Sequence, residues 1–321
     1  MPEVATTAGD TGVPVVQVVG FRMDFGPRTI VEDLTFDVHR GETFGFLGNN
    51  GSGKTTTIRA LLGIYQATAG TLHLGGRPFT PEDGHKLGYL PEECGLYKKE
   101  AVLDVMVYFG QLKGVSGPAS KAWSLDYLER VGLANKAGTR LDRLSGGQQQ
   151  KVQLGVTIMS KPELLILDEP AKGFDPVNRR LLMDIIAEQK RDGATVVMVT
   201  PQMDEVEQFC DRILLLKDGK AEAYGTIADV QARYGTRTAT ISYTGTLPED
   251  PEHIPLQIHP GKAPGESTAR LTLADNTDSA ALLRRLIGSG LGINSFTTSR
   301  TSLEEIFLGI YGAGSPSSEG A

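Results

Sequence analysis

The feature that most constrains the fold of this chain is one glycine-rich segment of nine consecutive residues. In order they are Gly48, Asn49, Asn50, Gly51, Ser52, Gly53, Lys54, Thr55 and Thr56. An apolar run, Thr43 to Leu47, precedes this segment, and a helical pattern, Ile58 to Tyr65, follows it. Glycine tolerates backbone angles that other residues avoid, so the N–H groups of such a loop can surround a phosphate chain at the start of a helix.

Two side chains of the segment carry chemistry. Lys54 supplies a positive charge, and the Thr55 hydroxyl stands where such loops ligate a magnesium ion on the phosphates. The match to G-x-x-x-x-G-K-[ST], in a strand-loop-helix context, predicts a nucleoside-triphosphate site. The alternative is a glycine-rich turn before an ordinary helix.

Composition excludes several classes of protein. The chain has 321 residues, is 40% hydrophobic and carries a net charge of −7 with both signs interspersed, so we expect no nucleic-acid partner. Cys94 and Cys210 lack metal-ligand spacing. No apolar run is long enough to cross a bilayer, and no signal peptide is evident, so a membrane role would come through a partner.

A second constellation follows the apolar strand Leu164 to Leu167, whose carboxyl end delivers Asp168 and Glu169. Ligands of open α/β sheets bind at this edge, where a carboxylate can hold magnesium on the triphosphate. Glu169 is the natural general base toward the attacking water. The alternative is an acidic strand end that only caps a turn.

Hydrophobic periodicity along the rest of this region predicts strands and helices in alternating order, which indicates an α/β fold with a mainly parallel sheet. The expected strands are 15–19, 34–38, 71–74, 195–199 and 212–216, and the expected helical segments are 102–131, 149–159, 179–191 and 204–210.

The sequence pattern changes beyond Tyr234, where prolines interrupt short runs in which apolar and polar residues alternate. Near the end, Ser302 and Glu305 have capping-box spacing, and the residues around them form an amphipathic helix that should dock on another element. The predicted parts are a disordered leader 1–13, a nucleotide-binding domain 14–234 with a helical subdomain at about 93–160, a small α+β domain 235–312 and a disordered tail 313–321.

Four motifs together resemble the nucleotide-binding subunit of an ATP-binding cassette (ABC) transporter: 48–55, 144–148, 164–170 and 173–176. The resemblance spans about Val15 to Tyr234. It implies a P-loop NTPase (RecA-like) cassette that binds ATP and Mg²⁺. Segments 89–97, 108–114 and 302–307 more narrowly resemble the exporter branch that includes sodium-efflux and antibiotic-resistance systems.

The resemblance implies roles for the matching residues. Phe25 would stack on adenine, although an isolated phenylalanine beside a strand is also typical of a core. Glu169 would be catalytic. Glu92 stands where many cassettes carry a glutamine, and it keeps an oxygen ligand. The implied magnesium ligands are Thr55, Glu92 and Asp168.

Other implied roles require a second cassette. A signature segment would act on the ATP held by the opposing subunit: Leu144, Ser145, Gly146, Gly147 and Gln148. Asp175 lies in a loop that would cross toward that subunit. The resemblance therefore implies two chains that meet head to tail, either as a homodimer or as a heterodimer with a different cassette.

Two positions depart from the family pattern. Pro201 stands where cassettes usually carry a histidine that touches the γ-phosphate, and Lys172 stands where serine is commoner. Proline offers no donor, so the chain's own ATP site is expected to be degenerate: it would hydrolyse slowly or rely on a competent partner. The alternative is that neighbouring groups replace the histidine.

The leading hypothesis is an ATPase subunit that drives export through separate transmembrane permease subunits, at the cytoplasmic face of the cell membrane. The alternative is a non-transport regulatory module that uses ATP to switch binding with little hydrolysis. The transported substrate leaves no signal in this chain.

Overall fold

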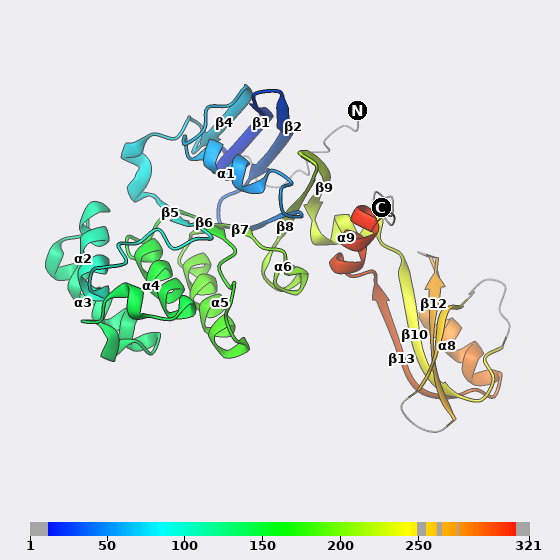
Figure 1. Ribbon diagram of the computed structural model, residues 1–321. Coiled ribbons are helices and arrows are strands. Elements are labelled where there is room, and N and C mark those ends of the chain that lie inside the picture. The colour runs from blue at the N-terminus through cyan, green and yellow to red at the C-terminus, as the bar shows by residue number, and fades with distance from the viewer. Residues whose placement is uncertain (1–11, 249–254, 262–264, 275, 313–321) are drawn as a thin grey trace, which may run out of the picture. The chain divides into compact units, whose positions relative to one another are not determined.

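The computed structural model describes residues 12–248, 255–261, 265–274 and 276–312. Internal contacts divide the chain into two units, the first ending at Gly225 and the second beginning at Thr226 (Figure 1). Residues 1–11 of the expected leader and the whole expected tail, 313–321, lie outside the described residues.

A six-stranded sheet forms the centre of the first unit, as expected for an α/β fold. Its order is β5 (Leu87–Leu90), β6 (Leu164–Asp168), β7 (Thr195–Val199), β3 (Thr43–Leu47), β8 (Arg212–Lys217) and β9 (Lys220–Thr226). The pairs from β5 to β8 are parallel. Every residue of β3, β6 and β7 is buried, which agrees with the apolar residues that make up most of their sequences.

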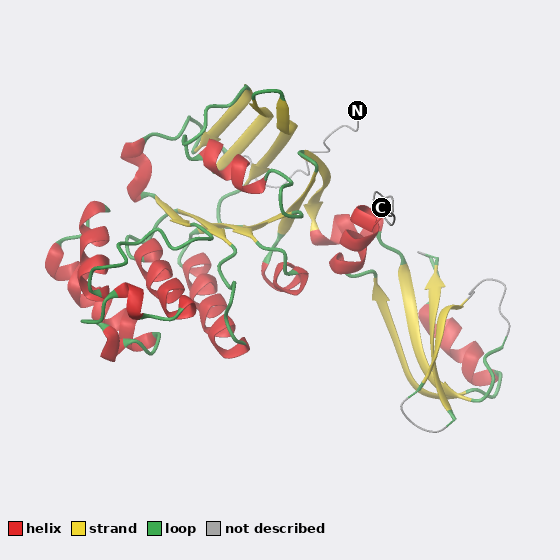
Figure 2. Cartoon of the chain, in the orientation of Figure 1, coloured by secondary structure: helices red, strands yellow, loops and turns green. Residues whose placement is uncertain are grey.

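A smaller sheet lies beside the central one in the same unit (Figure 2). Its strands, in the order β2 (Arg28–Val38), β1 (Val16–Phe25) and β4 (Ala69–Leu74), are antiparallel. A shared apolar core joins the two sheets, with Phe36 of β2 stacked on Phe44 of β3 at 5.6 Å between ring centroids.

The helices of this unit differ from expectation mainly at their ends. They are α1 (Lys54–Leu61), α2 (Val102–Leu112), α3 (Gly117–Arg130), α4 (Gly146–Ile158), α5 (Pro176–Arg191) and α6 (Met203–Phe209). Short 3₁₀ turns occupy Pro81–His85, Ala134–Lys136 and Leu141–Arg143. The expected helical segment 102–131 is two helices, separated at Gly114, whose φ is +83°.

Two helix starts next to the site motifs were predicted too late, and α5 likewise begins at Pro176 and not at Arg179. The first, α1, begins at Lys54 and not at Ile58, because Gly53 is its N-cap and the phosphate loop leads directly into it. The other, α4, begins at Gly146 and not at Gln149, because Ser145 caps it through a reciprocal capping box with Gln148.

The second unit begins with α7 (Ile227–Tyr234) and contains a four-stranded antiparallel sheet. Its order is β11 (Pro255–Pro260), β12 (Glu266–Leu273), β10 (Arg237–Thr244) and β13 (Gly292–Arg300). Alternating residues of β10 and β12 form a core with Leu282 and Leu286 of α8 (Ser279–Gly288). The capping box at Ser302 starts α9 (Leu303–Gly312), which packs against α7.

Candidate nucleotide-binding site

The carboxyl ends of three parallel strands meet at one edge of the central sheet. Phe46 of β3 pairs with Val199 of β7, and Val199 pairs in turn with Asp168 of β6. The glycine-rich loop after β3, the acidic pair at the end of β6 and the segment after β7 are therefore neighbours. This arrangement is the usual ligand edge of an open α/β sheet.

Glycine is required in the loop after β3. Gly48, Gly51 and Gly53 have φ angles of +149°, +81° and +110°. A side chain at Gly48 would clash with the carbonyl oxygen of Leu216, and a Cβ at Gly53 would lie 2.8 Å from the Val31 side chain. The loop conformation therefore depends on residues without a Cβ.

Lys54 lies inside this loop and is only 9% exposed. Its ammonium donates hydrogen bonds to the carbonyl oxygens of Gly48, at 2.7 Å, and Asn49, at 3.0 Å. Burial lowers the pKa of Lys54, and the nearby carboxylates of Asp168, Glu169 and Glu92 oppose that shift. No side chain of the described residues caps the N-terminus of α1, and its first turn carries no acidic residue, so that positive helix end is available to phosphate.

The acidic pair at the end of β6 lies close to Lys54. Asp168 is 3% exposed, and burial, helped by repulsion from Glu92 and Glu169, raises its pKa to about 6. The site therefore carries negative charge that a bound cation would relieve. Glu169 adopts a left-handed backbone, with φ +50°, and its N–H donates to the carbonyl oxygen of Val199 at 2.8 Å.

Lys172 is a cation that the sequence reading treated only as a departure from the family pattern. Its ammonium contacts the Glu92 carboxylate and lies 3.4 Å from Oε2 of Glu169. The sequence signal for this contact was that Lys172 follows Glu169 by three positions. A turn joins the two residues, in which the Lys172 N–H donates to the Glu169 carbonyl oxygen at 3.1 Å.

Gln153 of α4 is a second residue that the sequence reading missed. Its amide donates to the carbonyl oxygens of Pro91 and Glu93, each at 3.3 Å, and so holds the loop that carries Glu92 from both sides. Gln153 is 3% exposed. An interior glutamine in a helical pattern offers no sequence signal for contacts with a loop about sixty residues away.

Phe25 ends β1 and is 47% exposed, so it is not a core residue. Its ring meets the ring of Tyr65 edge to face, at 5.4 Å between centroids. Tyr65 follows the helix that begins at the phosphate loop, and its hydroxyl accepts a hydrogen bond from Arg59. An exposed aromatic face of this kind suits stacking on a base.

The signature segment starts α4. The Ser145 Oγ accepts from the N–H of Gln148 at 3.4 Å, which leaves its own hydroxyl hydrogen free to donate. Beside it lies a cavity of about 520 Å³ whose lining includes Ser145 to Gln148, Lys172 and Asp175. A Cβ at Gly147 would press on the Phe174 ring at 3.0 Å, so this glycine permits close packing.

The two remaining predicted residues lie in loops. Asp175 caps α5, since its carboxylate accepts from the N–H groups of Val177, at 3.0 Å, and Asn178, at 2.9 Å. These hydrogen bonds, that of Asn178 first, lower the pKa of Asp175. Pro201 is exposed between β7 and α6 and presents no donor to the site.

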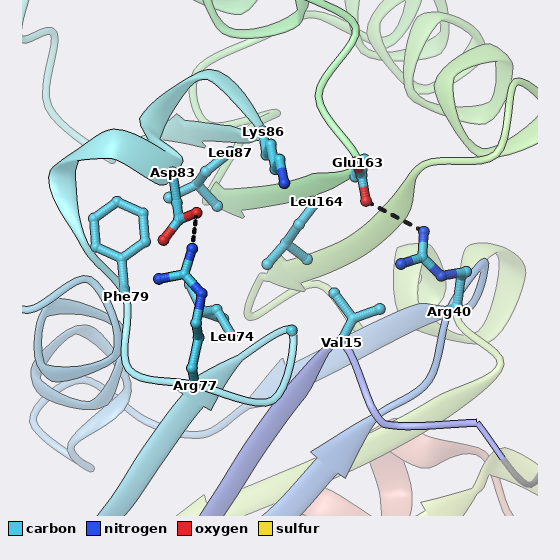
Figure 3. A pocket seen from close by; sticks show the side chains of 11 residues that line it. Val15, Arg40, Leu74, Arg77, Phe79, Asp83, Lys86, Leu87, Glu163 and Leu164 are labelled. Carbon is cyan, nitrogen blue, oxygen red and sulfur yellow. Dashed lines mark hydrogen bonds and ion pairs between the residues drawn. The ribbon is translucent and has the colours of Figure 1, made fainter.

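A further pocket, of about 230 Å³, lies where the parallel strands begin, at the end of the sheet opposite to the glycine-rich loop (Figure 3). Leu87 and Leu164, the first residues of β5 and β6, line it, together with the ion pair between Arg77 and Asp83 at 2.6 Å. It contains none of the predicted nucleotide-binding residues.

Across residues 12–248, 255–261, 265–274 and 276–312, no group of three or more histidine, cysteine, aspartate or glutamate side chains could hold a metal ion by itself. The same part of the chain contains no helix long and apolar enough to span a membrane.

Comparison with known proteins identifies the family. Residues 31–172 match the ABC transporter family model, and residues 225–311 match the C-terminal domain of DrrA1-3-like ATP-binding proteins. An uncharacterized ABC transporter ATP-binding protein of Methanocaldococcus jannaschii is 43% identical over 68% of this chain and 79% of its own length.

Two relatives have more specific names. The linearmycin resistance ATP-binding protein of Bacillus subtilis is 34% identical, over 70% of this chain and 73% of its own length. The Nod factor export ATP-binding protein I of Burkholderia lata is 35% identical, over 63% of this chain and 67% of its own length. A solved ATP-binding subunit of an ABC transporter superposes with a TM-score of 0.65 at 26% identity, covering 68% of this chain and 93% of its own. The chain belongs to the ATP-binding subunits of the ABC transporter family, which bind and hydrolyse ATP.

Proposed function

We propose that this chain is the ATPase subunit of an exporter and that it powers transport through separate transmembrane subunits. The observation that carries the proposal is the position of Lys54, which bonds the phosphate-loop carbonyls on one side and faces three carboxylates on the other. The names of the linearmycin resistance and Nod factor export relatives support the export direction.

The donor set at the site fits magnesium. Thr55, Glu92 and Asp168 would hold the ion, with phosphate and water oxygens as its further ligands. Burial, together with repulsion from Glu92 and Glu169, raises the pKa of Asp168 to about 6, and a bound cation would favour the ionised carboxylate. The ion supplies charge neutralisation for the transferring phosphoryl group.

The reaction is hydrolysis of the terminal phosphoanhydride. Water attacks the γ-phosphorus, the bond from that phosphorus to the β–γ bridging oxygen breaks, and Glu169 accepts a proton from the attacking water. Lys54 and the N-terminus of α1 stabilise the phosphate charge, and Phe25 stacks on adenine. ADP and inorganic phosphate are the products.

The proposed assembly contains two cassettes. Ser145 to Gln148 would act on the ATP of the opposing cassette, because the Ser145 hydroxyl is free to donate and a cavity lies beside the segment. Pairing and separation of the cassettes would drive the transmembrane subunits, with this chain held peripherally at the cytoplasmic face of the membrane.

We also propose that the chain's own site turns over slowly, because Pro201 replaces a donor to the γ-phosphate. One such donor is worth about 3 to 4 kcal/mol in comparable sites. A homodimer would then be a slow ATPase, whereas a heterodimer could rely on a second, complete site.

The test is magnesium-dependent ATPase of the purified full chain, alone and in the complex that co-purifies with it from membranes, with Glu169→Gln as the blank. We expect Glu169-dependent turnover and a membrane protein in the complex. ATP-dependent association with a non-membrane partner, without turnover, would favour the regulatory module instead.

A further inference from the structure

We propose that Lys172 is a positioning residue for ATP hydrolysis: one ammonium bridges Glu92 and Glu169 and fixes where the general-base carboxylate lies. The inference rests on the proposed role of Glu169 as the general base. It assigns to the loop after β6 the positioning of the Glu169 carboxylate, which is a separate role from that of the phosphate-loop residues.

The geometry is a three-member network of side chains. The Lys172 ammonium hydrogen-bonds Oε1 of Glu92 and lies 3.4 Å from Oε2 of Glu169. Glu92 comes from the loop after β5 and Glu169 from the end of β6, so Lys172 joins two different strand ends. A lysine can serve two carboxylates at once because its ammonium carries three donors.

A hydrogen bond fixes the backbone of Glu169, so the position of its carboxylate depends on the conformation of the side chain. The left-handed φ of +50° is held by the hydrogen bond from the Glu169 N–H to Val199 at 2.8 Å. The Glu169 side chain is 17% exposed, and the Lys172 ammonium is in contact with it. Displacement of a reacting group by about 1 Å can cost about 100-fold in rate, so this contact bears on catalysis.

The local charge explains why a bridge is needed. The carboxylates of Asp168, Glu169 and Glu92 all act on Lys54 electrostatically, and burial, with repulsion from the two glutamates, raises the pKa of Asp168. Without the Lys172 ammonium, Glu92 and Glu169 would repel each other and the base would move outward. Replacing Glu92 by a neutral amide would remove that repulsion.

A role in stability does not account for the network. The side chains of Lys172 and Glu92 are 58% and 42% exposed, and exposed ion pairs add little to folding free energy. Lys220 offers a matched control in the same unit, because it is 59% exposed and pairs with Glu32 at 3.2 Å on strands distant in sequence from the acidic pair.

The test is a double-mutant cycle in the full chain and its complex, with kcat, KM, ATP affinity and thermal midpoint measured for Lys172→Gln, Glu92→Gln and the double variant. We expect Lys172→Gln to lower kcat by about tenfold, with at most a small change in KM, as for groups coupled through one network. The double variant should recover most of that loss, and Lys172→Arg should retain activity. Lys220→Gln should match the parent.

Additive effects of the two substitutions on kcat, with Glu169-dependent turnover intact, would overturn the bridge and leave the proposed function standing. A fall in thermal midpoint that parallels the loss of activity would also overturn it. If the parent shows no Glu169-dependent turnover, the proposed function fails, and the positioning role that rests on it fails as well.

Discussion

Replacing Asp168 with asparagine should stabilise the nucleotide-free protein at neutral pH. Burial and two neighbouring glutamates raise the pKa of Asp168 from 3.8 to about 6, so the folded chain binds a proton more tightly than the unfolded chain. Folding is then favoured by this group below about pH 3.8, and the contribution is lost as the pH rises through 6. Above that pH the buried, ionised carboxylate of Asp168 destabilises the folded protein when no nucleotide is bound.

The magnitude follows from the shift. About two pKa units correspond to about 3 kcal/mol, which relaxation of the site and water entry would reduce to about 1 to 2 kcal/mol. For a unit of this size, each kcal/mol moves Tm by about 2 to 4 °C, so Asp168→Asn should raise Tm by about 2 to 8 °C at pH 7.5. At pH 4 the gain should nearly vanish, because Asp168 is then protonated.

The assay is thermal unfolding of the full chain with chelator and without nucleotide, from pH 4 to pH 8, followed by a signal that reports the transition of the first unit. Asp126→Asn, on the exposed side of α3, serves as the control for loss of a carboxylate. A gain that is the same at both pH extremes, or a loss of stability at pH 7.5, would refute the reasoning.

Three further outcomes are expected. Gly48→Ala should weaken ATP binding by at least about tenfold in calorimetry, because its methyl group would collide with the Leu216 carbonyl and displace the loop; unchanged affinity would contradict the assigned loop geometry. Gln153→Ala should lower the free energy of unfolding by about 1 to 2 kcal/mol and make the loop around Glu92 more sensitive to proteolysis, whereas unchanged proteolysis would show that the loop is held otherwise. Pro201→His should increase kcat of the complex; no increase would mean that other groups already replace that donor.

Sequence patterns predicted the parts of this fold that are encoded locally. The bounds of β3 and β7 agree with the apolar run 43–47 and the β-branched run 195–199, because a strand buried on both faces favours a nearly continuous apolar sequence. The phosphate loop is likewise a contiguous motif whose glycines have the positive φ angles that the motif requires. Its local sequence is enough to predict its conformation.

Other elements carry weak local signals. The edge strand β9 has the sequence KAEAYGT, with little apolar alternation, and it forms because Asp218 and Gly219 turn the chain back onto β8 with positive φ angles. The short strand β5 contains Gly88, where a Cβ would lie 2.6 Å from the Leu165 side chain. Its glycine reads as a breaker in the sequence but serves close packing in the sheet.

The contacts that connect the site to the rest of the cassette were beyond sequence reasoning, because they join distant segments. Gln153 lies eight residues after Ser145 on the same helix, a rise of about 12 Å at 1.5 Å per residue. One end of α4 therefore presents the signature segment, and a point two turns later holds the loop of Glu92, which Lys172 links to Glu169. Because a helix of this length moves as a rigid body, displacement of the Glu92 loop by a partner must either break the two Gln153 hydrogen bonds or carry Ser145 with it.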